Sequence, residues 1–347
     1  MRAKEHGFRQ PAEWSRHAAV WTAWPHLADE WAEGLDGPRA ALAQMIAAIV
    51  DRGPSGPRGE RVELLCASPA LEADARAHLG AAAGGVRFHR AHYGDVWLRD
   101  TGPIFVTRGH ERAAACFHWN GWGGKYLMPG DASVSTWVAG AAGVPAWDQG
   151  FVLEGGAVEV DGEGTVLTTK QCLLGGARNP DVDQDQAAAT RLLEDALGVD
   201  QVIWLDRGLV NDHTDGHIDT LARFVAPGVV VAMTPTGDDP NREALDGIIA
   251  DLRAAKDARG RALEVVTVPS PGLVQDATGA IMPASYMNFY IGNSTVVVPT
   301  YRAANDDAAV AAIAALFPDR RTVGVDCYPI LVGGGGFHCT TQQEPAP

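Results

Sequence analysis

The chain has 347 residues, of which 46% are hydrophobic, so it can bury the core of one large α/β domain or of two smaller ones. Its formal net charge of −15 at pH 7 would repel nucleic acid and anionic membrane surfaces and would attract small cations to an acidic cleft. The N-terminus has no apolar segment behind its charges, and no stretch of about eighteen residues is uninterruptedly apolar, so we expect a soluble, cytoplasmic protein.

Five segments carry apolar residues at helical spacing and end near Gly or Pro. In chain order, these predicted helices cover residues 38–51, 69–79, 181–197, 241–259 and 305–316. Short β-branched runs between them predict buried strands at residues 62–66, 202–205, 229–231, 265–268, 295–298 and 322–325. Residues 53–59 are rich in Pro and Gly and predict a surface loop that is too short to link two domains. The order of elements predicts a mixed α/β fold.

Five times along the chain, a predicted strand leads into a Gly- or Pro-containing loop with an unusual polar cluster. These strands cover residues 86–89, 146–148, 202–205, 265–268 and 323–326. Each cluster has one prominent residue, and successive ones are 51 to 71 residues apart: Asp100, Glu154, His217, Asn288 and Cys339. This spacing is compatible with diverged modules around a common centre. It favours a radial α/β assembly with one active site at its hub, whereas the alternative is an ordinary sandwich with scattered polar loops.

Cys339 follows four successive glycines, which allow the main chain to approach a ligand or to turn a nucleophile outward. An isolated Cys is commonly a small buried hydrophobe, but the polar residues that flank Cys339 favour a nucleophile. Its thiol would need a positive neighbour to ionise at neutral pH, and a bound guanidinium could supply that charge. The five cysteines are odd in number and widely spaced, as expected of reduced cytoplasmic thiols.

His217 and Asp219 stand two residues apart, so in an extended strand both side chains would project from the same face. Such a pair can place an acid/base group next to a carboxylate, although a polar surface loop would look similar. With His213, the same two residues could also be ligands of zinc. That set is incomplete, and neither Cys-x-x-Cys nor His-Glu-x-x-His occurs, so we expect no metal.

Two further carboxylates, Asp100 and Glu154, follow apolar segments at places where the chain can turn sharply. Each alone could be a turn residue. Together with Asp219, however, they would give three carboxylates near the proposed hub, which is costly unless a cation is buried among them. A guanidinium fits, because carboxylates can bind more than one edge of its planar fork, and Trp97 could stack on its face or belong to the core.

Motifs along nearly the whole chain resemble agmatine deiminases and their bacterial peptidyl-arginine deiminase relatives. They are Glu13-Trp14 with Trp21 and Trp24-Pro25, Trp97 to Pro103, Asn120 to Tyr126, Leu153 to Gly156, Arg178-Asn179-Pro180, Thr214 to Asp219, Ala284 to Phe289 and Gly333 to Gln343. The resemblance implies a single domain over residues 1–347 with the pentein β/α-propeller fold, in which five ββαβ-type modules surround a pseudo-fivefold axis.

The same resemblance implies roles for the clustered residues. Cys339 would be the nucleophile, His217 the acid/base, and Asp100, Glu154 and Asp219 the guanidinium-binding carboxylates, in a hydrolase that needs no cofactor. The substrate would be a small guanidino cation, and agmatine would yield N-carbamoylputrescine and ammonia through an amidino-thioether on the cysteine.

Substrate contacts are also expected from Trp97, Asp215, His213 and Asn288. Agmatine deiminases often carry Glu where this chain has His213, and Asn where it has Thr220, so recognition of the substrate tail departs from the family pattern. Arg178 or Arg223 could instead bind a carboxylate, which keeps peptidyl-arginine and free arginine open as substrates. A zinc amidohydrolase, a polyamine-binding protein and a homo-oligomeric assembly also remain open.

Overall fold

Five small mixed sheets contain most of the β-structure in the computed structural model, which describes residues 1–347. In four of them, two antiparallel strands are followed by a helix and by a third strand that pairs parallel to the second. These four sets are, in chain order, β6 (Ile104–Arg108), β7 (Glu111–His118), α5 (Asp131–Ala142) and β8 (Ala146–Val152); β9 (Glu159–Val160), β10 (Thr165–Thr169), α7 (Gln186–Leu197) and β11 (Gln201–Leu205); β12 (Ala222–Ala226), β13 (Val229–Thr234), α8 (Arg242–Ala254) and β14 (Glu264–Pro269); β15 (Tyr290–Ile291), β16 (Thr295–Thr300), α9 (Asp306–Leu316) and β17 (Arg321–Asp326).

The remaining sheet joins the two ends of the chain. The C-terminal strand β18 (Gln342–Pro345) pairs antiparallel with β1 (His17–Ala23), and β1 pairs parallel with β4 (Arg61–Cys66) after helix α1 (Asp36–Val50). Helix α2 (Pro69–Leu79) then leads to a fourth strand, β5 (Val86–Arg90). If β18 is placed first, this sheet repeats the order of the other four.

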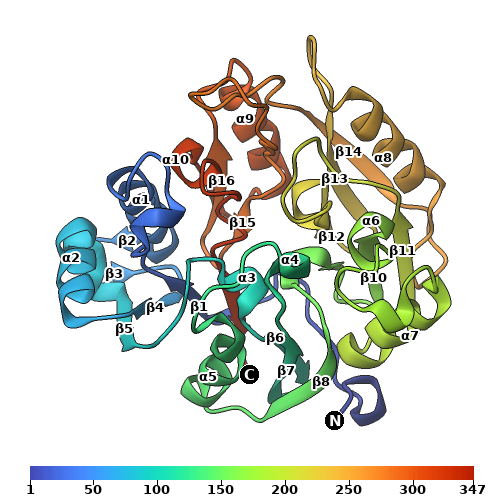
Figure 1. The fold of residues 1–347 in the computed structure, drawn as a ribbon, viewed down its shortest axis with the longest axis horizontal. Coiled ribbons are helices and arrows are strands. Elements are labelled where there is room, and N and C mark those ends of the chain that lie inside the picture. Colours follow the sequence, from blue (N-terminus) through green and yellow to red (C-terminus); the bar gives the residue numbers. More distant parts are fainter.

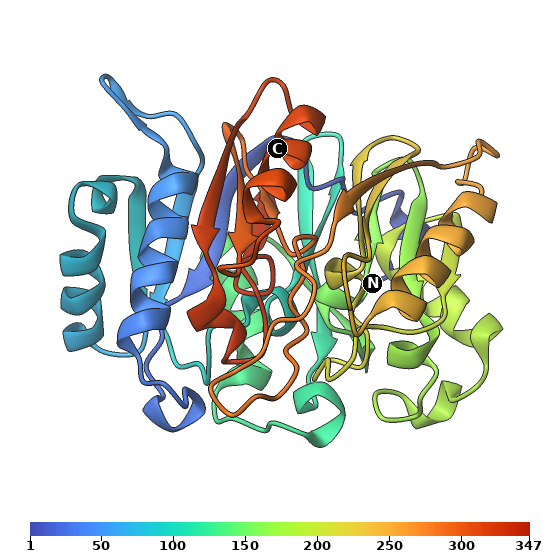
Figure 2. The ribbon, with the colours of Figure 1, turned by 90° about the horizontal axis from the view of Figure 1, so that it is seen from above.

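The sheets surround the middle of the molecule, and helices such as α2, α5, α7 and α8 lie toward the outside (Figure 1). Seen from above, α2 lies at one end of the molecule and α8 at the opposite end (Figure 2). The short helices α3 (Leu98–Thr101) and α4 (Gly121–Gly124) lie near the middle instead. No helix is both long enough and apolar enough to span a membrane.

The predicted helices and strands all occur, most of them with shifted ends. The helix predicted from residue 181 begins at Gln186, because Asp185 caps it by accepting a hydrogen bond from the Ala188 amide, and residues 180–182 form a separate 3-10 turn. The helix predicted to reach residue 259 ends at Ala254, where the chain turns back and residues 256 and 262 pair as an isolated bridge. Residues 53–59 contain parts of two short strands, β2 (Arg52–Gly53) and β3 (Gly56–Pro57), where only a loop was predicted.

A buried arginine links segments that are distant in the sequence. The guanidinium of Arg223, on β12, donates hydrogen bonds of 2.9 Å to Glu159 on β9 and to Glu13 near the N-terminus. It also donates to the carbonyl oxygens of Met287 and Phe289, just before β15. All the donors of Arg223 thus point into the protein, so this residue is not placed to bind a substrate carboxylate.

We predict that Arg223→Met lowers the free energy of unfolding by about 3–5 kcal/mol, because it leaves the buried carboxylates of Glu159 and Glu13 short of their cation. Urea titration followed by circular dichroism would measure the change. As a control, Arg207→Met should cost less than about 1 kcal/mol, because Arg207 and its partners Asp206 and Glu243 are exposed. Equal losses in the two variants would contradict a structural role for the buried network.

Candidate active site

The five clusters converge on one buried hub. Asp100 lies on α3, Glu154 lies two residues after the end of β8, and His217 directly precedes a 3-10 turn that contains Asp219. Asn288 precedes β15, and Cys339 lies between α10 (Tyr328–Leu331) and β18. Each of these six residues is at most 6% exposed. The hub is therefore largely dry, which strengthens the electrostatic interactions within it.

Cys339 is held by Asn288 on two sides. The Asn288 side-chain amide donates to Cys339 Sγ at 3.2 Å, and its oxygen accepts from the Cys339 amide at 3.2 Å. Sγ also lies 3.7 Å from Asp219 Oδ2. Burial raises the pKa of the Cys339 thiol well above its ordinary value, and the carboxylates of Asp219 and Asp100 raise it further. The thiol thus needs a nearby cation before it can become a good nucleophile.

The glycines before Cys339 allow this close packing. A Cβ at Gly335 would lie 2.7 Å from the Trp97 ring and 3.2 Å from Cys339 Sγ. A Cβ at Gly336 would lie 2.5 Å from Asn288 Oδ1, and Gly334 has a φ of +114°, which side chains rarely adopt. The run is therefore required by contacts with the thiol and its neighbours, as well as by backbone geometry.

His217 is fully buried beside Asp100, with its Nδ1 3.8 Å from Asp100 Oδ1. Neither ring nitrogen has a hydrogen-bond partner. Burial alone would lower the pKa of His217, but Asp100, followed by Cys172 and Glu154, raises this pKa to about 10. A Cβ at Gly156 would lie 2.5 Å from His217 Nδ1, 3.0 Å from Asp100 Oδ1 and 3.2 Å from Asp219 Oδ2, so the three side chains surround this glycine.

The three carboxylates differ in their partners. Asp100 accepts from Trp122 Nε1 at 2.9 Å and from the Gly156 amide at 3.0 Å, whereas Glu154 Oε1 accepts from Arg178 Nε at 3.0 Å. Burial raises the pKa of Asp100.

Asp219 has the opposite shift. Burial would raise its pKa, but His338, whose Nδ1 lies 2.7 Å from Asp219 Oδ2, lowers it. Glu154 Oε2 and Asp219 Oδ1 are buried without any hydrogen-bond partner. Unpaired carboxylate oxygens of this kind are costly, and a cation with several N–H donors would satisfy them.

A cavity of about 150 Å³ reaches Cys339 and Asp100. Its walls include the indole rings of Trp97 and Trp122, and Trp97 stacks on Trp31 with ring centroids 5.9 Å apart. The cavity contains no Lys or Arg side chain, and it is lined by Glu30, Asp95, Trp97, Asp100, Trp122, Tyr126, Met128, His213, Thr214, Val332, Gly333, Gly334, Gly335 and Cys339. Its acidic and aromatic lining suits a small cation.

The expected tail-binding residues differ in their surroundings. His213 lines the cavity, where its ring stacks on Tyr126 and its Nδ1 shares a 2.8 Å hydrogen bond with the Tyr126 hydroxyl. Asp215 does not line the cavity, because it is paired with Lys125 at 2.6 Å and with Arg178. Arg178 also binds Glu154 and the Thr214 carbonyl, so its guanidinium faces these partners and does not line the cavity where a substrate carboxylate would lie.

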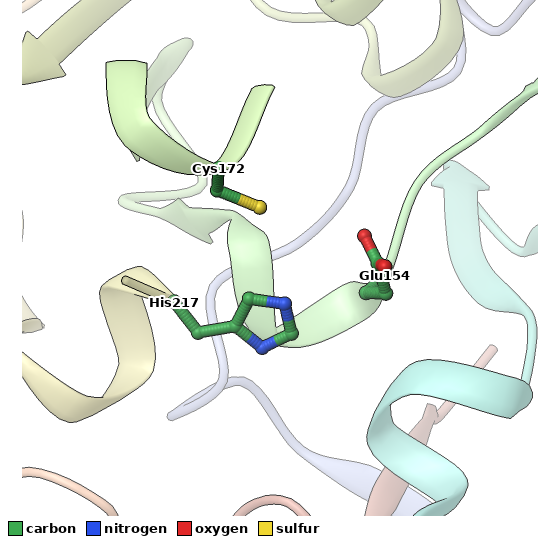
Figure 3. A group of neighbouring side chains, drawn as sticks. All are labelled: Glu154, Cys172 and His217. Atoms are coloured by element: carbon green, nitrogen blue, oxygen red, sulfur yellow. The ribbon is translucent and has the colours of Figure 1, made fainter. Parts of the chain in front are cut away.

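Sequence reasoning missed one member of the hub, Cys172. Its thiol lies with a carboxylate oxygen of Glu154 and a ring nitrogen of His217 in a group whose atoms are all within 4.8 Å of one another (Figure 3). This group differs from the zinc set considered from the sequence, because His213 and Asp219 are not in it. Cys172 follows strand β10, so the pattern of a strand leading into a reactive side chain was the available signal.

Comparison with known proteins agrees with this geometry. Residues 9–345 match the Porphyromonas-type peptidyl-arginine deiminase family. The chain belongs to this family. It is 36% identical to the agmatine deiminase of Ectopseudomonas mendocina, over 98% of this chain and 96% of that protein.

Two further relatives point the same way. The agmatine deiminase of Pseudomonas aeruginosa (strain UCBPP-PA14) is 37% identical over 98% of this chain and 96% of its own length. The solved agmatine deiminase of Enterococcus faecalis superimposes with a TM-score of 0.90 at 33% identity, over 99% of this chain and 98% of that one. The family resemblance read from the sequence motifs is thereby confirmed.

We predict that iodoacetamide labels Cys339 at least about tenfold faster than any other thiol of the native protein, because only Cys339 lines the cavity. The rate should rise with pH through the neutral and alkaline range, because the pKa of this thiol is raised. Intact-mass and peptide mass spectrometry would count and locate the labels. The Cys339→Ala variant should remain unlabelled over the same time, and faster labelling of Cys66, Cys116, Cys172 or Cys327 would contradict the assignment.

Proposed function

We propose that this protein is an agmatine deiminase, which hydrolyses agmatine to N-carbamoylputrescine and ammonia. The observation that carries the proposal is the buried hub itself, which brings together the Cys339 thiol, the His217 ring and three carboxylates, and whose Cys339 and Asp100 line a cavity without basic side chains. The relatives named as agmatine deiminases, at 36–37% identity over nearly the full chain, support the same substrate.

We also infer that the chain is a single domain with the pentein β/α-propeller fold. The five sheets support this, because each has the same order of antiparallel pair, helix and parallel strand once β18 is placed before β1. In such a ring the loops after the strands would meet at the axis. That would explain why residues as distant as Asp100 and Cys339 share one hub.

Binding of the guanidinium would precede the chemistry. Its N–H groups would meet Glu154 Oε2 and Asp219 Oδ1, the two buried oxygens without partners, and the carboxylate of Asp100. Its positive charge would balance the negative charge of the three carboxylates. The same charge would favour the thiolate form of Cys339. The substrate thus helps to activate its own nucleophile.

The first half-reaction forms a covalent adduct. Cys339 Sγ adds to the central guanidinium carbon, and the tetrahedral adduct expels ammonia after His217 gives a proton to the departing nitrogen. The C–N bond breaks with its electron pair on nitrogen, and an amidino-thioether remains on Cys339. In the second half-reaction His217 takes a proton from water as the water oxygen attacks the same carbon, and collapse breaks the C–S bond and releases the ureido product. No cofactor enters this sequence.

Recognition of the substrate tail would rest on cavity acids other than the paired Asp215. Asp95 and Glu30 line the cavity, and Asp95 Oδ1 is buried without a partner. Burial raises the pKa of Asp95 to about 7, and an alkylammonium bound beside it would favour the carboxylate form. An α-carboxylate would enter the same space without any Arg or Lys to meet it, so arginine should bind poorly.

We predict that agmatine exceeds L-arginine in kcat/KM by at least roughly 10³, because an unpaired buried carboxylate costs several kcal/mol. Ammonia release and formation of the ureido product would be measured side by side. n-Butylguanidine has the same carbon chain without the ammonium group. Comparing it with agmatine shows whether the site attracts the ammonium group or only accommodates it. Comparable turnover of arginine or of a peptide with internal arginine would redirect the proposal to those substrates, and binding of agmatine without turnover would favour a polyamine-binding protein.

We predict that each of Asp100→Asn, Glu154→Gln and Asp219→Asn lowers kcat/KM for agmatine by a factor on the order of 10²–10⁴. The loss corresponds to roughly 3–5 kcal/mol for a buried cation that is short of one partner. Steady-state assays would measure it, with Asp246→Asn on the exposed face of α8 as a neutral control. Losses below tenfold in all three hub variants would refute the guanidinium cage.

A further inference from the structure

Three donors of different chemistry meet in the hub, and the proposed reaction uses only two of them. Glu154 directly precedes a 3-10 turn, Cys172 lies on α6 (Lys170–Leu173), and His217 precedes another 3-10 turn. In Figure 3 a ring nitrogen of His217 and the Cys172 thiol face a common space beside the Glu154 carboxylate, and one ligand atom from each lies within 4.8 Å of the others. All three residues are at most 1% exposed.

The backbone holds this arrangement in place. Thr169 donates a 2.7 Å hydrogen bond to the Gly216 carbonyl, and its hydroxyl also accepts from the Cys172 amide at 3.3 Å. One side chain therefore joins the first turn of α6 to the residue before His217. The proximity of Cys172 and His217 thus follows from a specific tie between their two segments.

The possible ligand atoms around this space have no other bonding partners in the protein. Both ring nitrogens of His217 and the Oε2 atom of Glu154 are buried without hydrogen-bond partners, and Cys172 is a free thiol. Sulfur, imidazole nitrogen and carboxylate oxygen are together the donor types that zinc prefers, and three protein ligands leave a fourth position open. Ordinary Zn–S, Zn–N and Zn–O bonds of about 2.0–2.3 Å would require each ligand atom to move inward by less than about 1 Å.

We propose that Glu154, Cys172 and His217 form a binding site for a thiophilic divalent cation such as zinc. Binding would form a Zn–S bond as the thiol proton of Cys172 leaves to solvent, and a Zn–N bond as the coordinating nitrogen of His217 also gives up its proton to solvent. A thiolate and a carboxylate would then balance the two charges of the ion. Arg178 would keep its hydrogen bond to Glu154 Oε1, at 3.0 Å, and its charge is already shared with Asp215. Glu154 Oε2 is thus left to the ion.

Occupancy of this site would switch the enzyme off. The ion would take a nitrogen of His217 and the free oxygen of Glu154, which the proposed deiminase reaction needs for proton transfer and for the guanidinium. Zinc and agmatine would therefore exclude each other. This consequence rests on the proposed function, whereas binding of the ion does not.

The test is a zinc titration of the metal-free protein against a chromophoric zinc indicator. We expect one zinc per chain in the wild type and at least roughly 100-fold weaker binding in Cys172→Ala, since even loss of a residue that only supports a ligand costs 10–100-fold. Cys66→Ala, which removes a buried thiol in β4, is the matched control and should bind as the wild type does. Cys172→Ser keeps the volume of the side chain, and circular dichroism would verify that both Cys172 variants are folded.

Cobalt provides a second readout that does not depend on activity. A thiolate-to-cobalt charge-transfer band should appear in the wild type and in Cys339→Ala, and it should be lost in Cys172→Ala and Cys172→Ser. Loss of the band and of zinc binding in Cys339→Ala, with both kept in the Cys172 variants, would place the ion on the nucleophile and overturn the proposal. Absence of zinc binding by the folded wild type would overturn it as well. If zinc binds as expected but agmatine is not turned over, the proposed function fails and the metal site stands.

Discussion

The structure depends on the charge balance of a hub from which water is excluded. Asp100, Glu154 and Asp219 are buried together, and a cluster of carboxylates is tolerable in such a place only if cations or donors face them. The protein provides part of this through Arg178, His338 and Trp122, and leaves one oxygen on Glu154 and one on Asp219 unmet. The positions of these two unpaired oxygens thereby select the cation that completes the charge balance.

The same balance extends from the hub into the scaffold. His338, directly before Cys339 in the chain, lies between Asp219 and Glu13, at 2.7 Å and 2.6 Å, and Glu13 in turn binds Arg223. One chain of ionic contacts therefore runs from the carboxylate beside the thiol to the arginine that joins β12, β9 and the N-terminal segment. Because buried ionic groups of this kind tolerate little displacement, the network holds Asp219 at a fixed place relative to Cys339. Folding and site geometry are in this sense determined by the same residues.

Much of the fold and of the hub could be predicted from the sequence, because both depend on local patterns. Helix α2 was predicted with its observed ends, since Ser68 and Pro69 are strong start signals and the Ser68 hydroxyl does cap the helix. Helix α5 was missed, because its Ala-, Gly- and Ser-rich sequence has little contrast between its faces. Strand β7 was missed as well, because its central residues are alanines and not β-branched.

The hub residues that sequence reasoning found share one property, which is that each follows a predicted strand at a turn. The pairings among them could not be predicted, because they join residues far apart in the chain, as Arg178 does with Asp215 and Glu154. Cys172 was missed for a different reason. A lone cysteine is ordinarily a core residue, and its place after strand β10 is a weak signal without its position against His217.

His213 and Thr220 depart from the residues that agmatine deiminases often carry. The position of Arg178 explains why these two differences do not require a different kind of substrate. This arginine faces inward to Glu154 and Asp215, so its charge stabilises the hub and does not reach the cavity. The cavity keeps a net acidic lining from Glu30, Asp95 and Asp100, although a histidine stands at position 213. That histidine is itself held by Tyr126, which fixes its ring as a flat wall. Selection for a cationic tail then depends on the overall field of the cavity and on the absence of a basic partner, and no single carboxylate at position 213 is required.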